Sequence, residues 1–222
     1  MPDLPHHVTQ RGNNKENVFL DDQDRRFYLG GLKECSQKFG LKIWAYCLMT
    51  NHVHFIVVPE NQNSIAKTMA SLHATYALYF NAKAKRSGHL WQGRFFSSVL
   101  DEQYTYAAVR YVERNPVRAG LVIKAEEYFW SSAKAHISKI PNPILSYCPL
   151  LEEIPNWSDY LTDEEDARFL SGIRHATHRG RPTGKEEFIS RMEQVLQKDL
   201  TPKIRGRPVL INRDRHYLFS NK

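Results

Sequence analysis

Cysteine is scarce in this sequence, and the few cysteines are isolated from one another. The 222 residues contain Cys35, Cys47 and Cys148 and no Cys-x-x-Cys pair. Closely spaced cysteine pairs are typical of structural zinc sites and of redox motifs, so neither class of site is indicated. Isolated thiols favour a reducing compartment, and we therefore expect a cytoplasmic protein.

Long apolar runs are also missing. No stretch approaches the roughly 20 residues that a membrane-spanning helix needs. The first residues, MPDLPHH, hold neither a basic nor an apolar segment, so we expect no secretory signal and no membrane partner. Repeats of solenoid length and low-complexity tracts are absent from the sequence as well, which indicates an ordinary folded chain with a sizeable core.

Acidic residues are outnumbered by basic ones. The 31 lysines and arginines against 24 acids give a net charge of +7, which favours an anionic partner. Nucleic acid and an anionic membrane surface both fit this charge, and of the two we expect nucleic acid. Residues 149–166 carry seven acids and no base, whereas residues 167–222 carry 13 bases and five acids. We therefore expect a first domain over residues 1–125, an acidic linker over 126–166 and a basic extension over 167–222.

Hydrophobic patterning predicts an α+β fold for the first domain. Its order is β-α-β-β-α-β, followed by one more helix near residues 101–115, and this is the order of a ferredoxin-like antiparallel sheet with helices on one face. In the third strand, alternation places Val53, Phe55 and Val57 under these helices. In the second strand, alternation would put Ile43 on the same face as Ala45 and Cys47. The additional helix is then expected to cover the other face.

The stretch NHVHFIVVP places two histidines one residue apart at the start of the third strand. His52 and His54 therefore share the face that the additional helix covers. Two parallel imidazoles are either a metal clamp or a solvated pair, and with 10 histidines in the chain the motif alone does not decide. Tyr111 and Asn115, four residues apart on the covering helix, share one helix face. Two imidazoles and an amide oxygen suit Mg²⁺ or Mn²⁺, and a tyrosine beside the metal would be the nucleophile.

Four segments, HHVTQRGNN, AYCLMTNHVHFIVV, LWQGRFF and YVERNPVRAGLV, occur in order between about residues 4 and 125. Together they resemble the HUH single-strand transposases, and specifically the IS200-like, REP-associated tyrosine transposases of bacteria. The resemblance implies that His52 and His54 bind a divalent metal ion, Mg²⁺ or Mn²⁺, and that Tyr111 is the nucleophile. Asn115 matches the third ligand position, where related insertion-sequence transposases often have glutamine.

The resemblance also implies an activity: metal-dependent cleavage and strand transfer of single-stranded DNA at REP hairpins. Such enzymes stay attached through a 5′-phosphotyrosine and leave a free 3′-OH. It further implies a bacterial, nucleoid-associated protein, as either a monomer or a homodimer. Two alternatives stay open. One is a metal-dependent phosphodiesterase that uses water, with Tyr111 only structural, and the other is a hairpin-binding regulator without chemistry.

Arginines near the motifs and in the extension are expected to contact DNA, although any of them can be an ordinary solvated charge. They are Arg11, Arg94, Arg110, Arg114, Arg118, Arg179, Arg181, Arg205 and Arg207. The last four belong to two Arg-Gly-Arg-Pro segments, which resemble the core of an AT-hook. The alternative is a basic tail with nonspecific phosphate contacts. We expect the extension to hold the duplex stem while the histidine and tyrosine site holds the single-stranded flank.

Overall fold

Four antiparallel strands form the centre of the computed structural model, which describes residues 1–163 and 167–200. The strands are β1 (His6–Arg11), β2 (Leu41–Leu48), β3 (His52–Pro59) and β4 (Phe96–Val99). Their order across the sheet is β2-β3-β1-β4, with every neighbouring pair antiparallel. This is the arrangement expected of a ferredoxin-like β-α-β-β-α-β chain, so the predicted α+β fold is confirmed.

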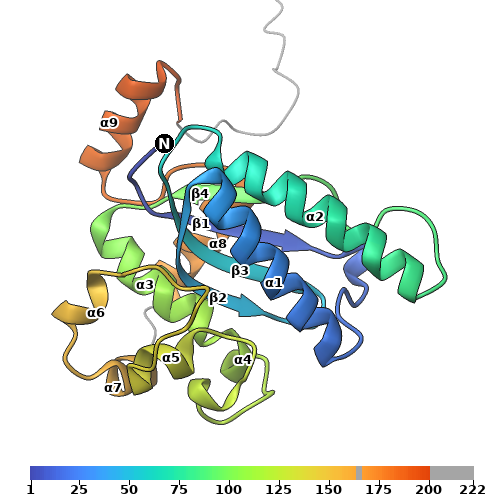
Figure 1. Cartoon of the computed structure of the whole chain (residues 1–222). Coiled ribbons are helices and arrows are strands. Elements are labelled where there is room, and N and C mark those ends of the chain that lie inside the picture. The colour runs from blue at the N-terminus through green and yellow to red at the C-terminus, as the bar shows by residue number, and fades with distance from the viewer. Residues whose placement is uncertain (164–166, 201–222) are drawn as a thin grey trace, which may run out of the picture.

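Helices α1 (Asp22–Phe39) and α2 (Ser64–Lys83) cover one face of the sheet (Figure 1). Helix α1 begins after Asp21, whose carboxylate accepts from the backbone N–H of Asp24 at 3.0 Å. It ends at Gly40, whose φ of 64° is the left-handed conformation that glycine adopts without a steric penalty. Both boundaries are therefore encoded locally in the sequence.

The predicted alternation of side chains is confirmed in β3 and wrong in part of β2. Val53, Phe55 and Val57 are fully buried in the core under α1 and α2. In β2, the register shifts between Ile43 and Ala45, which marks a β-bulge. Because the bulge inserts one residue, Ile43 joins the core under the helices, whereas Ala45 and Cys47 lie in the core on the other face.

Two helices cover the second face of the sheet. One is α3 (Glu102–Glu113), which begins at the N-cap Asp101 and is followed at once by α4 (Asn115–Arg118). The other is α8 (Ala167–Arg179), which packs on β1, β4 and α3. The sequence predicted α3 in this place, but α8 lies in the segment that we expected to be a basic extension.

The acidic segment also packs onto the second face. It contains the 3₁₀ turn η2 (Ala125–Glu127) and helices α5 (Ala133–Ser138), α6 (Leu150–Glu153) and α7 (Trp157–Thr162). Cys148, Leu150, Trp157 and Leu161 are buried in the core formed with α3. The domain boundaries stay a prediction, but the described part of residues 126–166 is packed chain rather than a linker that spans solvent.

Two further short elements complete the described chain. The 3₁₀ turn η1 (Asn13–Lys15) follows β1, and helix α9 (Glu186–Leu196) buries Phe188 and Met192 against Val99. No helix within residues 1–163 and 167–200 is both long enough and apolar enough to cross a membrane. Cys35, Cys47 and Cys148 are free thiols.

A buried carboxylate fastens the acidic segment to α3. Glu113, the last residue of α3, is fully buried and accepts hydrogen bonds from the hydroxyl of Ser132 and from Nε1 of Trp157, the latter at 2.8 Å. Nδ1 of His136 lies 2.7 Å from the same carboxylate. A carboxylate out of water needs such partners, so Glu113 specifies how α5 and α7 pack.

We expect Glu113→Ala to lower the free energy of unfolding by about 3 kcal/mol, because the buried N–H of Trp157 loses its acceptor and the Ser132 hydroxyl loses a carboxylate partner. Glu34→Ala, at an exposed position of α1, is the control and should cost within about 0.5 kcal/mol. Urea unfolding at pH 7 measures both. Similar losses in the two variants would contradict a specific role for the buried carboxylate.

Acid should destabilise the fold through buried neutral histidines, of which His73 in α2 is the test case. Its Nε2 lies 2.9 Å from the Tyr28 hydroxyl, and burial lowers the pKa of His73 to about 3. The unfolded chain takes up this proton below pH 6.5 and the folded chain does not, so the free energy of unfolding falls as pH falls. Between pH 7 and pH 5 the contribution of His73 is about 2 kcal/mol. His73→Gln should remove that part of the pH dependence in urea titrations, and an unchanged pH dependence would contradict it.

Candidate active site

Strand pairing places the two histidines of β3 beside polar residues of β1. Arg11 lies directly opposite His52, and Thr9 lies directly opposite His54. Because directly paired residues of antiparallel strands share a face, all four point away from α1 and α2. The prediction that His52 and His54 stand together on the second face is confirmed, and their ring centroids are 4.9 Å apart.

The protonated nitrogen of His52 follows from its neighbours. The side-chain nitrogen of Asn51 donates to the Lys15 carbonyl at 3.0 Å, which fixes the orientation of the Asn51 amide. The amide oxygen of Asn51 then faces Nδ1 of His52 at 2.6 Å. An amide oxygen only accepts, so Nδ1 of His52 carries the proton and its Nε2 keeps a lone pair. This is the state in which an imidazole binds a metal ion.

His54 meets a third histidine that the sequence analysis did not select. Nδ1 of His54 lies 2.9 Å from Nε2 of His7, and the two rings are stacked with centroids 5.1 Å apart. Nδ1 of His7 lies 2.8 Å from the hydroxyl of Thr177 in α8. The alternation of β1 contains the signal for His7, since it shares a face with Thr9 and Arg11. Thr177 carries no local signal, because it lies 170 positions from His7 along the chain.

Burial keeps the three histidines neutral. It lowers the pKa of His7 to about 3 and that of His54 well below its usual value. The pKa of His52 falls to about 4, first through burial and then through the positive charge of Arg11. Neutral imidazoles are the form that ligates metals, so protons do not compete for these nitrogens near pH 7.

Helix α3 brings Tyr111 against the histidines of the same chain. The tyrosine is 6% exposed, and its ring meets the rings of His54 and His7 edge-on, with centroids 5.6 and 5.7 Å away. The guanidinium of Arg118 lies 4.2 Å from the centroid of the Tyr111 ring, and that of Arg174 in α8 lies 5.6 Å from it. Like His7 and Thr177, Arg174 is a residue of this site that the sequence analysis did not select. Two imidazoles and two guanidiniums thus surround the phenol ring.

Asn115 lies at the start of α4, one helical turn beyond Tyr111. Its side-chain nitrogen donates to the Tyr111 carbonyl at 3.0 Å and lies 3.3 Å from that of Val112. The nitrogen is thereby used, and the side-chain oxygen is the atom able to bind a cation. Its part as a third ligand stays a prediction.

The donor set fits a hard divalent cation better than zinc. The described residues contain no group of three histidine, cysteine, aspartate or glutamate side chains placed to hold a metal ion. With Asn115 as the predicted third ligand, a metal site at His52 and His54 would have two imidazoles, an amide oxygen and positions left for water or phosphate oxygens. That composition suits Mg²⁺ or Mn²⁺, as the sequence predicted.

The predicted DNA-contacting arginines divide into two groups in the described chain. Arg11 and Arg118 lie at the site, beside His52 and Tyr111. Arg110 instead stacks on Tyr160, with its guanidinium 4.5 Å from the ring centroid, and Arg114 donates to the Asp163 carbonyl. Arg94 is exposed in the loop before β4. Contact with DNA stays a prediction for all five.

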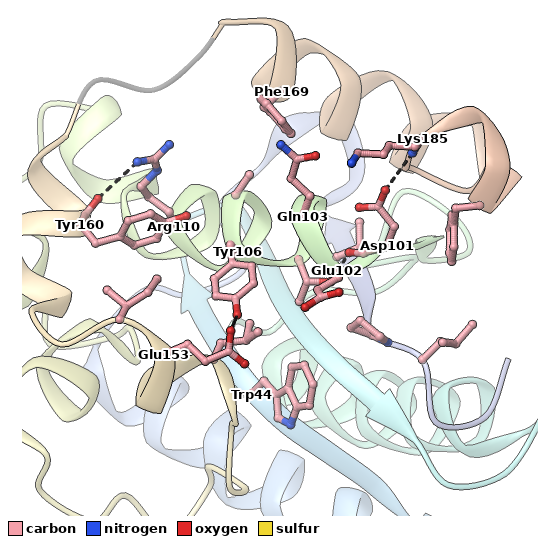
Figure 2. Close-up of a pocket in the computed structure, with 18 of the residues that line it drawn as sticks. Trp44, Asp101, Glu102, Gln103, Tyr106, Arg110, Glu153, Tyr160, Phe169 and Lys185 are labelled. Atoms are coloured by element: carbon pink, nitrogen blue, oxygen red, sulfur yellow. Dashed lines mark hydrogen bonds between the residues drawn. The ribbon is translucent and has the colours of Figure 1, made fainter.

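Figure 2 shows a separate hollow of about 1350 Å³, which another face of α3 lines. Tyr106 of α3 points toward Glu153 there, and Arg110 toward Tyr160. Its lining residues do not include His52, His54 or Tyr111, so this hollow is not the place of the proposed chemistry.

The first Arg-Gly-Arg-Pro segment ends α8 and is fastened to β4. Gly180 has a φ of 61°, and the Arg181 carbonyl accepts from the Ser98 hydroxyl at 2.6 Å. Arg179 is exposed and Arg181 is half-buried. The second segment, with Arg205 and Arg207, lies outside the described residues. An interaction of either segment with DNA stays a prediction.

Comparison with known proteins agrees with the sequence and with the fold. A solved structure described as the REP-associated tyrosine transposase bound to a REP hairpin matches with a TM-score of 0.54 and 16% identity, over 68% of this chain and 88% of that chain. At that identity the likeness concerns the fold. A crystal structure from Deinococcus radiodurans R1, described as that of a candidate transposase, has a TM-score of 0.39 and 18% identity, over 51% of this chain and 92% of that chain.

No curated protein matches the sequence. The model of the family described as "Transposase IS200 like" matches residues 1–115, which is more than half of the 222 residues and includes His52, His54, Tyr111 and Asn115. The chain therefore belongs to the IS200-like transposase family.

Proposed function

We propose that this transposase cuts and rejoins single-stranded DNA through a covalent bond between Tyr111 and a DNA 5′-phosphate. The observation that carries the proposal is the position of the Tyr111 ring, whose centroid lies 5.6 Å from that of the His54 ring and 4.2 and 5.6 Å from the guanidiniums of Arg118 and Arg174. A nucleophile, two metal-binding imidazoles and fixed positive charge are the parts that phosphoryl transfer requires.

The reaction is a transesterification in two directions. The Tyr111 hydroxyl attacks the scissile phosphorus. A new bond forms between the phenol oxygen and this phosphorus, which stays on the 5′ end of the downstream strand, and the bond from the phosphorus to O3′ of the upstream strand breaks. The phenol loses its proton and the departing O3′ gains one, so the step leaves a 5′-phosphotyrosine and a free 3′-OH. In the reverse direction a 3′-OH attacks the phosphotyrosine and releases Tyr111. One phosphodiester replaces another, and strand transfer needs no external energy source.

His52 and His54, through Nε2, and Asn115, through its side-chain oxygen, would hold Mg²⁺ or Mn²⁺. When bound there, the cation would polarise the scissile phosphate and stabilise the charge that develops on it. The protein itself supplies the positive charge of Arg11, Arg118 and Arg174, which attracts the DNA backbone.

Burial of Tyr111 favours transfer to tyrosine over hydrolysis by water. The side chain is 6% exposed, and α8 lies over the same face of the sheet. A phosphodiesterase that uses water instead requires a water molecule opposite the leaving oxygen. Such an enzyme, and equally a regulator without chemistry, would form no protein–DNA adduct.

The proposed substrate is a DNA hairpin with a single-stranded flank, of the REP type. The solved structure with the same fold is described as bound to a REP hairpin. This chain carries a net charge of +7, which suits a nucleic-acid partner and a nucleoid-associated protein in a bacterial cytoplasm. In this proposal Arg11 and Arg94 contact the flank. The stem is held by the extension, with Arg179, Arg181, Arg205 and Arg207.

We expect Tyr111→Phe to reduce cleavage of a hairpin substrate at least about 1000-fold, because the phenyl ring has no nucleophile. Hairpin affinity should stay within about twofold, since only a hydroxyl is lost. A denaturing gel with Mn²⁺ and labelled single-stranded hairpins detects the adduct. Tyr106→Phe is the matched control, because Tyr106 lies on the same helix and its hydroxyl bonds to Glu153. Cleavage by the Tyr111→Phe variant, or cleavage by the wild type without an adduct, would favour the phosphodiesterase.

Loss of either strand histidine should weaken metal binding. We expect His52→Ala and His54→Ala each to lower Mn²⁺ affinity at least about 10-fold, because each removes one of two imidazole ligands. The free energy of unfolding should change by less than about 2 kcal/mol in His52→Ala, whose side chain is half-buried. His89→Ala, in an exposed loop, is the control. Titration calorimetry in the absence of DNA measures the Mn²⁺ affinity of each variant. Unchanged affinity in both His52→Ala and His54→Ala would show that these histidines do not bind the metal ion.

A further inference from the structure

A chain of three hydrogen bonds runs from the Ile173 carbonyl within α8 through Thr177 and His7 to His54. The Thr177 hydroxyl lies 2.7 Å from the Ile173 carbonyl and 2.8 Å from Nδ1 of His7. Nε2 of His7 lies 2.9 Å from Nδ1 of His54. Thr177, His7 and His54 are 1%, 2% and 6% exposed, so water does not compete for these contacts.

The direction of the first bond is fixed at the Ile173 carbonyl. A carbonyl oxygen only accepts, so the single proton of the Thr177 hydroxyl points to Ile173. The hydroxyl oxygen must then accept from Nδ1 of His7. In the opposite arrangement two oxygens would face each other at 2.7 Å without a proton between them, which is repulsive.

The remaining two bonds follow from the first. A neutral His7 has one ring proton, and because this proton is on Nδ1, Nε2 of His7 is bare and accepts from Nδ1 of His54. His54 then has its own single proton on Nδ1, and its Nε2 keeps a lone pair. His7 and His54 are 2% and 6% exposed, and burial of this kind favours the neutral ring with one proton.

We infer that Thr177, acting through His7, holds His54 in the tautomer whose Nε2 can bind a metal ion. Thr177 is thus a positioning residue for the metal site, and this part of the inference rests on the proposed function. His52 reaches the same tautomer by another route, through Asn51 in the turn before β3. The two ligands are therefore set independently, one by a local turn and one by α8.

The inference also assigns a part of the site to the C-terminal region. The family model matches residues 1–115, whereas Thr177 lies well beyond that match. Outer contacts that orient ligating histidines typically change metal affinity 10- to 100-fold when they are removed. A chain that ends before α8 would keep His52, His54 and Tyr111 but would lose the contact that selects the tautomer of His54.

The test compares two substitutions at Thr177 with one elsewhere. Thr177→Val keeps the side-chain shape and removes the hydroxyl, and Thr177→Ser keeps the hydroxyl. Thr105→Val is the matched control, because Thr105 is also 1% exposed and its hydroxyl donates to the carbonyl four residues earlier, that of Asp101, at 2.6 Å. The control therefore removes the same kind of helix bond without touching the histidines.

Two measurements on the full-length, DNA-free chain decide the matter. Long-range ¹H–¹⁵N NMR spectra of the metal-free protein report which nitrogen of each histidine carries the proton. We expect Nδ1 to be protonated in His7 and His54 of the wild type, of Thr177→Ser and of Thr105→Val, and the pattern to be lost in Thr177→Val. Calorimetric titration with Mn²⁺ should show affinity reduced about 10- to 100-fold in Thr177→Val and within threefold of wild type in the other two.

Two outcomes would overturn the inference. One is a wild-type spectrum in which His54 is protonated on Nε2. The other is a Thr177→Val protein whose spectrum and Mn²⁺ affinity both equal those of the wild type. The proposed function fails separately, through the absence of an adduct at Tyr111, because neither the spectra nor the titration involves DNA. A fall in affinity in Thr177→Ser as large as in Thr177→Val would also overturn it, since α8 would then support the site by packing alone.

Discussion

The pairing of β1 with β3 determines where every residue of the candidate site points. Its register sets Arg11 opposite His52 and Thr9 opposite His54, and it keeps Phe55 on the face under α1 and α2. A slip of one residue would turn the polar set of one strand into the apolar core, so the register is strongly specified. Because both strands lie in the middle of the sheet, each is held on two sides, and the imidazoles stand on a rigid support.

A face that carries histidines can be buried at low cost only if the N–H groups of the rings have acceptors. His54 is 6% exposed beneath Tyr111 and the neighbouring helices, and its Nδ1 is bonded to His7. Such burial keeps the rings neutral and strengthens every electrostatic interaction at the site. The helices that exclude water from the site also supply the hydrogen-bond partners of its histidines. The position of the ring proton of His54 therefore depends on Thr177 in α8, through His7.

Local patterns predicted much of this architecture from sequence. Alternation in β3 and the four-residue spacing of Tyr111 and Asn115 are properties of residues close together in the chain, so they can be recognised directly from the sequence. The bulge after Ile43 has no such signal, because the same residues in regular alternation form an equally good strand. The acidic composition indicated a linker over residues 126–166. Composition gives no sign that Trp157 is buried there and donates a hydrogen bond to Glu113. Contacts as distant in sequence as that of His7 with Thr177 leave no periodic trace at all.

The C-terminal region is both strongly basic and packed onto the rest of the protein, and its composition predicts only the first of these properties. Its charge is basic, as expected of a segment that meets DNA, yet α8 and α9 bury Ile173 and Phe188 in apolar clusters. One side of α8 brings Thr177 and Arg174 to the histidine and tyrosine site, and its end is fastened to β4 through the Arg181 carbonyl. DNA bound to this region would therefore act on α8, the helix that we infer sets the tautomer of His54. If the extension holds the stem and His54 binds a metal ion, as proposed, packing would link the two, since α8 cannot shift on β1 and β4 without changing the contact between Thr177 and His7.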